Sequence, residues 1–482
     1  MHIYDRVTEL FLRPQPHHHF SLTSNQHIVF QLDTMSLRSL KYVDPRKVMR
    51  SLSPRITYEG RRSLKIAVEG CCHGELDAIY SHISQLERRN QYKVDLLLIC
   101  GDFEAIRNPQ DMECMSVPQK YKVMGDFHKY YTGEKRAPLL TIVIGGNHEA
   151  SNYFWELYHG GWLAPNIYFL GHSGSVKVNG LNIAGASGIY KAHDFQLGNY
   201  EKMPYDSRSL RSIYHTREYC IRKLSLLPSN HIFMSHDWPQ YIEQYGDTKS
   251  LVKRNPHFRR DVETGLLGSP PLMELLRTLR PEWWFAAHMH TRFEATVEHQ
   301  GPPPRQPVRK PDGATTQRAT TPSETQFLAL DKCLPNRDFL EVIDLAVPED
   351  DAPAQPASST SAADELTLSY DPDWLAITRA FHPLLSTTRQ QPPFPDEVDA
   401  RALIAKEREW VLKNIPTNSR GEIPVMDYQQ FAMTAPGPGT EGSDVQRQPR
   451  WYTNPQTVAL CRMLDIPNKI NPPPKSAGGP RH

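Results

Sequence analysis

The chain has 482 residues with a formal net charge of +1, and 39% of its residues are hydrophobic. This length allows two or three domains with sizeable cores, whereas the near-zero charge predicts neither nucleic-acid nor membrane binding and leaves any anionic partner to a local patch. The seven cysteines follow no disulfide spacing, no secretory leader is recognisable, and no run of 18 apolar residues occurs. We therefore expect free thiols, a reducing compartment (cytosol or nucleus) and no membrane-spanning helix.

Residues 1–63 show little pattern and are expected to form a disordered N-terminal extension. A mitochondrial transit peptide is one alternative, which acidic residues such as Asp5 and Glu9 disfavour. A wrongly assigned start codon is the other.

From Leu64 onward the pattern alternates between strand and helix. "LKIAVEG" predicts a buried strand, the apolar spacing from Leu76 to Leu86 predicts a helix, and "VDLLLICGDF" predicts a second buried strand. A strand, helix and strand within about 40 residues favour a parallel pair in a larger sheet. Asn179-Gly180, between apolar alternations, predicts a hairpin turn. Further strands are expected in "LLTIVIGGNHE", "NIYFLG", "SVKVNGLNIAGAS", "NHIFMSHDW" and "EWWFAAHMH".

Two polar, Pro-rich segments divide the second half of the chain. Residues 301–325 predict a loop or linker inside the main domain, which spans residues 64–345, and residues 346–364 predict a second linker. Residues 365–470 contain three stretches of helical periodicity and predict a smaller, mainly helical C-terminal domain. Residues 471–482 are expected to be a disordered tail.

Potential metal ligands follow several of the predicted strands. Loops at the carboxyl ends of such strands converge on one crevice, so side chains far apart in sequence can meet there. A single histidine after a strand is more often an ordinary loop residue, and the order of all the motifs together is what predicts a metal site. The residues are Cys71, His73, Asp102, Asn147, His148, His236, His288 and His290.

Over residues 65–295, this order of motifs resembles that of the calcineurin-like metallophosphoesterases. The motifs of that family are Asp-x-His, Gly-Asp, Gly-Asn-His-Glu/Asp, His and Gly-His-x-His. The resemblance implies an α/β fold, in which a β-sandwich is flanked by helices and joined to the smaller C-terminal domain. Ala287 stands where glycine is usual, and Cys71 stands where aspartate is usual.

A narrower resemblance accounts for the cysteine. Several segments resemble the RNA lariat debranching enzymes, a family with cysteine at the position of Cys71. The segments are "AVEGCCHGELD", "LLICGDFEAIRN", "IGGNHEASNY", "SGIYKAHDF", "SIYHTRE" and "FLALDKCLPNRDFLEVIDL", and the resemblance resumes at "YDPDWL" and "NPQTVALCRMLDI".

The resemblance implies two metal sites that share Asp102. The first would use Cys71, His73, Asp102 and His290, and the second would use Asp102, Asn147, His236 and His288. His148 is the expected general acid, with an orienting role as the alternative. Thiolate is softer than carboxylate and favours Zn²⁺ or Fe²⁺ over Mg²⁺, so the first site should differ from its aspartate-bearing relatives and could be partly empty. The expected cofactors are up to two divalent ions, Fe²⁺, Zn²⁺ or Mn²⁺, and Cys72 should point away into the packing.

Residues 187–218 interleave aromatic and basic residues between two predicted strands. Aromatic rings can stack on unpaired bases while cations hold phosphates, although the composition alone is equally typical of an ordinary surface excursion. In the family this insertion is the lariat recognition loop. The expected substrate-binding residues are Tyr190, Lys191, His193, Tyr200, Tyr205, Arg211 and Tyr214.

The resemblance implies a metal-dependent hydrolase that opens the 2′–5′ phosphodiester bond at the branch point of excised intron lariats. The expected partner is branched intron RNA, the expected location is the nucleus, and no membrane contact is expected. The C-terminal region could simply cover the core or could dock splicing factors. A general phosphatase or phosphodiesterase of the same fold is the main alternative, and a non-catalytic scaffold is a weaker one because every ligand position is filled.

Overall fold

The computed structural model describes residues 63–228, 230–301, 322–347, 366–440, 442 and 444–473. They belong to one compact unit of the chain, Glu59–His482. Nearly all of the predicted N-terminal extension, and most of both predicted linkers and of the tail, lie outside these residues. No helix in the described ranges is long and apolar enough to cross a membrane.

The described residues form two sheets, the first of which has the strand order β12-β1-β2-β3-β5-β4. Strands β1, β2, β3 and β5 are parallel, while β12 and β4 add antiparallel edges. Ile66 pairs with Leu96, which confirms the parallel pair predicted at the start of the domain. The bounds are β1 Ser63–Glu69, β2 Leu96–Ile99, β3 Leu140–Val143, β4 Gly161–Ala164, β5 Ile167–Phe169 and β12 Leu340–Ala346.

The second sheet has the order β10-β11-β9-β8-β7-β6-β13-β14. Asn179 and Gly180 join β6 to β7 with φ of 47° and 85°. Positive φ at both central residues is the geometry that favours Asn-Gly, so the predicted hairpin is confirmed. The bounds are β6 Ser173–Val178, β7 Leu181–Ala186, β8 Ile232–Ser235, β9 Trp283–Ala286, β10 Phe293–Glu298, β11 Glu324–Ala329, β13 Leu368–Tyr370 and β14 Ile423–Pro424.

The main core lies between the two sheets. Leu96 and Leu98 of β2 pack there with Ile183 and Met234 of the second sheet. The alternate residues of β2 face the other side, where they pack with residues of α3. This two-residue alternation is what a strand buried on both faces requires. The predicted β-sandwich flanked by helices is therefore confirmed.

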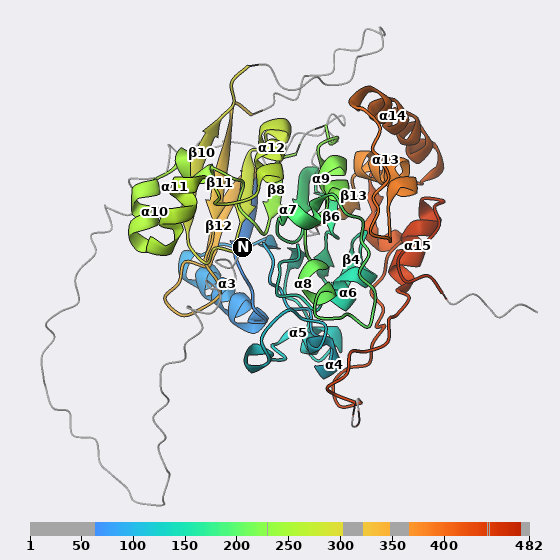
Figure 1. Cartoon of the computed structure of the whole chain (residues 1–482), viewed down its shortest axis with the longest axis horizontal. Coiled ribbons are helices and arrows are strands. Elements are labelled where there is room, and N and C mark those ends of the chain that lie inside the picture. Colours follow the sequence, from blue (N-terminus) through green and yellow to red (C-terminus); the bar gives the residue numbers. More distant parts are fainter. Residues whose placement is uncertain are drawn as a thin grey trace, which may run out of the picture. The chain divides into compact units, whose positions relative to one another are not determined.

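Helices cover the outer faces of the sheets and make up much of the C-terminal region (Figure 1). Each of the three stretches with helical periodicity contains a helix, and Asp371, Asp396 and Asn454 are N-caps whose side chains accept backbone N–H groups. The bounds are α3 Leu76–Asn90, α4 Pro109–Met112, α5 Phe127–Tyr131, α6 Ser151–Glu156, α7 Ala192–Phe195, α8 Ser209–Ser212, α9 Glu218–Leu224, α10 Thr248–Arg254, α11 Arg259–Thr264, α12 Pro270–Leu279, α13 Pro372–Phe381, α14 Glu397–Asn414 and α15 Pro455–Met463.

The C-terminal region also extends the second sheet, since β13 pairs with β6. Gln456 further binds the edge strand β4, where its side chain accepts the N–H of Trp162 at 2.8 Å and donates to the Trp162 carbonyl at 2.9 Å. The side-chain amide of Gln456 thus pairs with the backbone of β4 as a neighbouring strand would. Without it, buried backbone groups of this edge strand would lack hydrogen-bond partners.

Candidate metal centre and its neighbouring recognition segment

The predicted ligands follow five strands whose carboxyl ends point to one place. Strands β1, β2 and β3 run parallel in the first sheet, and β8 and β9 run parallel in the second. The two sheets pack face to face, so the loops after these five strands meet at one end of the sandwich.

The first predicted site is assembled in the structure. One ligand atom from each of Cys71, His73, Asp102 and His290 lies within 4.8 Å of all the others. The Nε2 atom of His73 is 3.2 Å from His290 Nε2 and 3.7 Å from Asp102 Oδ2. One sulfur, two imidazoles and a carboxylate are a donor set that suits zinc or ferrous iron.

The second predicted site lies on the other oxygen of Asp102. The Oδ1 atom of Asp102 is 3.3 Å from His236 Nε2, which is 3.2 Å from Asn147 Oδ1. The rings of His236 and His288 are 5.0 Å apart. The two carboxylate oxygens of Asp102 thus face different ligand groups, which is the geometry that a bridging residue needs.

Two glycines allow the close approach of these groups. A Cβ atom on Gly146 would lie 2.2 Å from Asp102 Oδ1, and one on Gly101 would lie 2.4 Å from His236 Nδ1. Ala287, where glycine is usual, lies fully buried, and its carbonyl accepts a hydrogen bond from Trp238 Nε1 at 2.8 Å. The extra methyl group is accommodated in the core.

The backbone at the centre is strained. Four candidate ligands have positive φ, from 45° to 60°: His73, Asp102, His288 and His290. Such conformations cost about 1–3 kcal/mol each in non-glycine residues and persist only where the surrounding structure enforces them. Their concentration here indicates that the fold holds these side chains in place for a function.

The electrostatic environment favours cation binding. Burial tends to raise the pKa of Asp102, but the neighbouring His236, His148 and His73 hold it well below its usual range. Burial lowers the pKa of His73, His288 and His290, which keeps these imidazoles neutral and able to bind a metal. Burial, then the charges of Asp102 and Glu69, raise the pKa of the Cys71 thiol. A metal ion must therefore displace the thiol proton on binding.

Cys71 and Cys72 point to opposite sides of the first sheet, as predicted. Cys71 belongs to the core between the sheets and Cys72 to the outer core beside α3. The Cys71 sulfur also accepts the backbone N–H of His288 at 3.1 Å, which ties the loops after β1 and β9 together.

His148 lies beside the centre. Its backbone N–H donates to Asp102 Oδ1 at 2.9 Å, and its ring is 5.2 Å from the ring of His73. A ring nitrogen of His148 also lies within 4.8 Å of Glu104 and His73 ligand atoms. Its side chain is thus at the edge of the centre, where it can reach a bound substrate.

Two acidic residues at the centre were given no role by the sequence prediction, although Glu149 belongs to the Gly-Asn-His-Glu motif. Glu104 has φ of 61° and lies 3.2 Å from His73 Nδ1, and burial raises its pKa to about 8. Glu149 accepts backbone N–H groups of Phe103, Glu104 and Gly146, so it joins the loops after β2 and β3. The available signal was their position, two residues after Asp102 for Glu104 and directly after Asn147-His148 for Glu149.

The segment 187–218 begins at the metal centre. Gly188 N–H donates to the Gly145 carbonyl at 2.8 Å, and Tyr190 N–H donates to Asp237 Oδ2 at 3.3 Å. Gly145 is two residues before Asn147, and Asp237 directly follows His236. The segment therefore starts between two of the loops that supply candidate ligands.

The predicted substrate-binding residues differ in how much of each side chain is exposed to solvent. His193 and Arg211 are exposed, and Tyr190, Lys191, Tyr200 and Tyr214 are half-buried. Tyr205 differs from the prediction, because its ring is buried with Cys114 and Ile213 and is not available for stacking on a base. Sequence composition could not distinguish this packing residue from the other tyrosines.

A buried polar network supports the segment from inside. Arg217 donates to Glu201 Oε1 at 2.5 Å and to the Asp194 carbonyl at 2.7 Å, and Asp194 also bonds to His215 at 2.7 Å. Arg217 is 2% exposed, so it holds the segment together and does not bind phosphate from its surface.

Parallel strands that place a shared carboxylate between two groups of histidine, cysteine and asparagine ligands define a two-metal phosphoesterase. In agreement, residues 64–292 match the family model of calcineurin-like phosphoesterases, and residues 322–469 match that of the lariat debranching enzyme C-terminal domain. The chain belongs to the lariat debranching enzyme family.

Curated relatives bear this name in distant organisms. The lariat debranching enzyme of Danio rerio is 43% identical over 406 residues, which cover 84% of this chain and 66% of the relative. That of Arabidopsis thaliana is 42% identical, with 85% and 88% covered, and that of Schizosaccharomyces pombe is 39% identical, with 85% and 98% covered.

Proposed function

We propose that this chain is a metal-dependent phosphodiesterase that hydrolyses the 2′–5′ bond at the branch point of lariat RNA. The products would be a linear RNA with a free 2′-hydroxyl and a 5′-phosphate. The observation that supports this most is the aromatic and basic segment 187–218, which begins directly at a two-site metal centre. Because lariats arise from splicing, a nuclear location is part of the proposal, as is docking of splicing factors on the C-terminal region.

The donor sets fit two divalent ions, with Zn²⁺, Fe²⁺ or Mn²⁺ as the proposed metals. Cys71, His73, Asp102 and His290 would hold one, and Asp102, Asn147, His236 and His288 the other. When bound, such ions neutralise phosphoryl charge and lower the pKa of water.

His148 would move the proton. The leaving 2′-oxygen needs a proton as its bond to phosphorus breaks, and His148 is close to the centre without belonging to either ligand group. Burial lowers the pKa of His148, whereas the charges of Asp102 and Glu104 raise it. An approaching anionic phosphodiester adds a further negative charge, which favours the protonated imidazole.

Cys71→Asp is expected to shift metal preference toward Mn²⁺ and Mg²⁺, because carboxylate is a harder ligand than thiolate. Metal analysis of protein loaded from equal mixtures of ions, together with turnover in each ion, measures this shift. Cys71→Ser is the control, because serine keeps the size of the side chain and removes the soft sulfur donor. Cys72→Asp is not suitable, because Cys72 is fully buried in the outer core. Identical metal profiles for the parent and Cys71→Asp would exclude Cys71 as a ligand.

Tyr190→Ala is expected to lower kcat/KM for branched RNA about 5- to 150-fold, the value of one stacked base. Tyr190 is half-buried, its ring lies 5.4 Å from that of Phe195, and its backbone N–H donates to Asp237 next to the candidate ligand His236. Tyr190→Phe keeps the stacking surface and should retain most of the activity. Exchange of the whole segment is a poorer test, since it would remove the buried Arg217 network. Equal kcat/KM for the parent and Tyr190→Ala would contradict a recognition role.

A further inference from the structure

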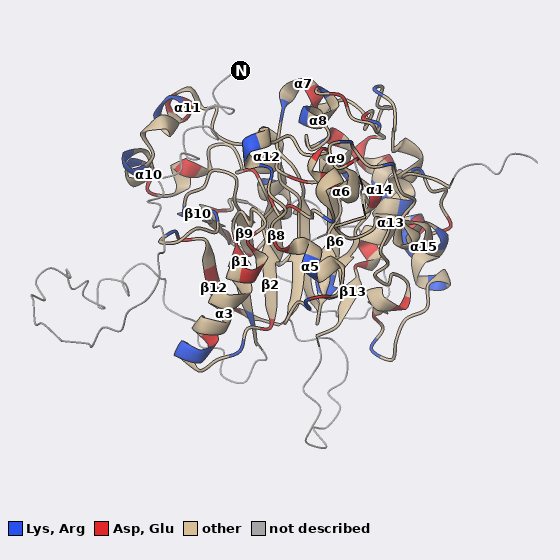
Figure 2. Cartoon of the chain, turned by 90° about the horizontal axis from the view of Figure 1, so that it is seen from below, with Lys and Arg blue, Asp and Glu red and all other residues tan. Residues whose placement is uncertain are grey.

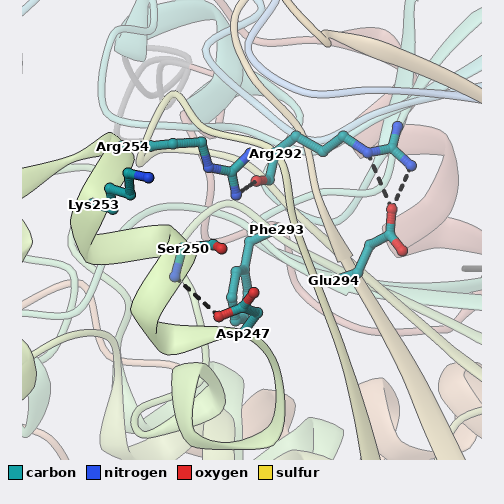
Figure 3. A pocket seen from close by; sticks show the side chains of 7 residues that line it. All are labelled: Asp247, Ser250, Lys253, Arg254, Arg292, Phe293 and Glu294. Carbon is teal, nitrogen blue, oxygen red and sulfur yellow. Dashed lines mark hydrogen bonds and ion pairs between the residues drawn. The ribbon is translucent and has the colours of Figure 1, made fainter. Parts of the chain in front are cut away.

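An open pocket of about 600 Å³ lies outside the segment 187–218 (Figure 3). It is formed by α10 on one side and by the start of β10 on the other. Its volume is within the range of pockets that bind small ligands or single nucleotides. The lining residues are Asp247, Ser250, Lys253, Arg254, Arg292, Phe293 and Glu294.

This pocket adjoins the metal centre through the chain. Arg292 is two residues after the candidate ligand His290, and two residues of extended chain span at most about 7 Å. The end of α10 is attached to the same loop, since Asn255 Nδ2 donates to Thr291 Oγ1 at 2.8 Å and Arg254 Nη2 donates to the Arg292 carbonyl at 3.2 Å.

Only some of the basic side chains that line the pocket form ion pairs with carboxylates. Arg292 pairs with Glu294 and Glu341, each at 2.5 Å. Among the described residues, no carboxylate lies within ion-pairing distance of Lys253 or Arg254, and both are exposed. Asp247 is the other acid in the lining, and its side chain caps α10 by accepting Ser250 N–H at 3.0 Å. Lys253 and Arg254 therefore remain available to an anion, on the α10 wall seen in Figure 3.

The floor is apolar and fixed. The ring of Phe293 stacks on Trp238 at 5.4 Å, and Gly246 permits close approach because a Cβ atom there would lie 2.6 Å from Phe293 Cζ. Tyr245, directly before Gly246, is 37% exposed. Gly246 bridges to Ala295 of β10, so Tyr245 lies near this pocket in the chain. An exposed aromatic residue and two exposed cations near one pocket are a combination typical of single-stranded nucleic-acid binding.

We infer that this pocket binds the sugar–phosphate backbone of one RNA arm as it leaves the branch. The inference rests on the proposed function, and it adds a second RNA contact that is separate from the segment 187–218. Lys253 and Arg254 would hold phosphates of the arm, and Tyr245 would support a neighbouring base. The pocket would therefore matter for branched RNA with long arms and hardly at all for a substrate without them.

The test compares the intact, metal-loaded chain with Lys253→Glu/Arg254→Glu on branched RNAs with short and long arms and on bis(p-nitrophenyl) phosphate. We expect kcat/KM for the long-armed RNA to fall at least about 10-fold relative to turnover of the small phosphodiester. The slope of log kcat/KM against log salt should flatten by about 1.4, or 0.7 for each lost phosphate contact. Lys253→Gln/Arg254→Gln serves as a milder pair should charge reversal impair folding.

Lys406→Glu/Lys413→Glu is the matched control, because it reverses the same number of charges on two exposed residues of α14. Figures 1 and 2 show α14 far from α10. An equal loss in the control, an equal loss on the small phosphodiester, or a loss that does not depend on arm length would overturn the inference. Unchanged RNA kinetics in both double variants of Lys253 and Arg254 would also overturn the inference. That result would favour an acidic protein as the partner of these two cations. If the parent chain opened no branched RNA, the proposed function itself would fail.

Discussion

Replacement of His148 by alanine is expected to reduce kcat for branched RNA by about 10²–10⁴-fold, the usual contribution of general acid catalysis. His148 lies beside Asp102 and His73 but in neither ligand group, so its loss should remove proton transfer and leave the ions bound. Single-turnover rates together with metal analysis of the same sample measure both effects.

A substrate with a better leaving group provides the control for His148. A p-nitrophenolate leaving group needs no proton, so His148→Ala should impair cleavage of bis(p-nitrophenyl) phosphate far less than cleavage of branched RNA. A metal content that fell in step with activity would instead assign His148 a structural role.

Replacement of Arg107 by methionine is expected to lower the free energy of unfolding by about 3–5 kcal/mol, because it leaves buried carboxylates without their counter-ion. Arg107 is fully buried, and its guanidinium bonds to Asp111 at 2.8 Å and to Glu156 at 2.8 Å. It also donates to Thr434 Oγ1 at 2.8 Å, so one side chain joins the loop after β2 to the C-terminal region.

Arg401→Met is the matched control for Arg107→Met. Arg401 pairs with Glu397 on the surface of α14, and such exposed pairs contribute about 0.3–0.5 kcal/mol. Thermal denaturation at equal metal content should therefore show a clear fall in the midpoint for Arg107→Met and almost none for Arg401→Met. Similar midpoints for the two variants would show that the Arg107 network contributes little.

The metal centre could be predicted because its residues follow local signals. Each candidate ligand comes directly after a hydrophobic strand, and parallel strands direct those ends to one edge. The opposite orientations of Cys71 and Cys72 also followed from the two-residue period of a strand. The exact partners, such as the contact of each Asp102 oxygen with a different histidine, needed the three-dimensional fold.

Other features could not be predicted because burial depends on partners far away in the sequence. Tyr205 and Arg217 have the same composition signal as their exposed neighbours, yet they pack with Cys114 and Glu201. Arg107 is fully buried and bonds to Glu156 and also to Thr434, which lies 327 residues later in the chain. The α10 pocket likewise depends on a strand that starts at Phe293.

The most direct test is incubation of the metal-loaded chain with a synthetic 2′–5′ branched RNA, beside a linear 3′–5′ RNA of the same composition. We predict that the branched RNA is converted to linear strands, one with a 5′-phosphate and one with a free 2′-hydroxyl at the former branch, while the linear RNA stays intact. An intact branched RNA under conditions where the same sample hydrolyses bis(p-nitrophenyl) phosphate would contradict the account and would favour a general phosphodiesterase.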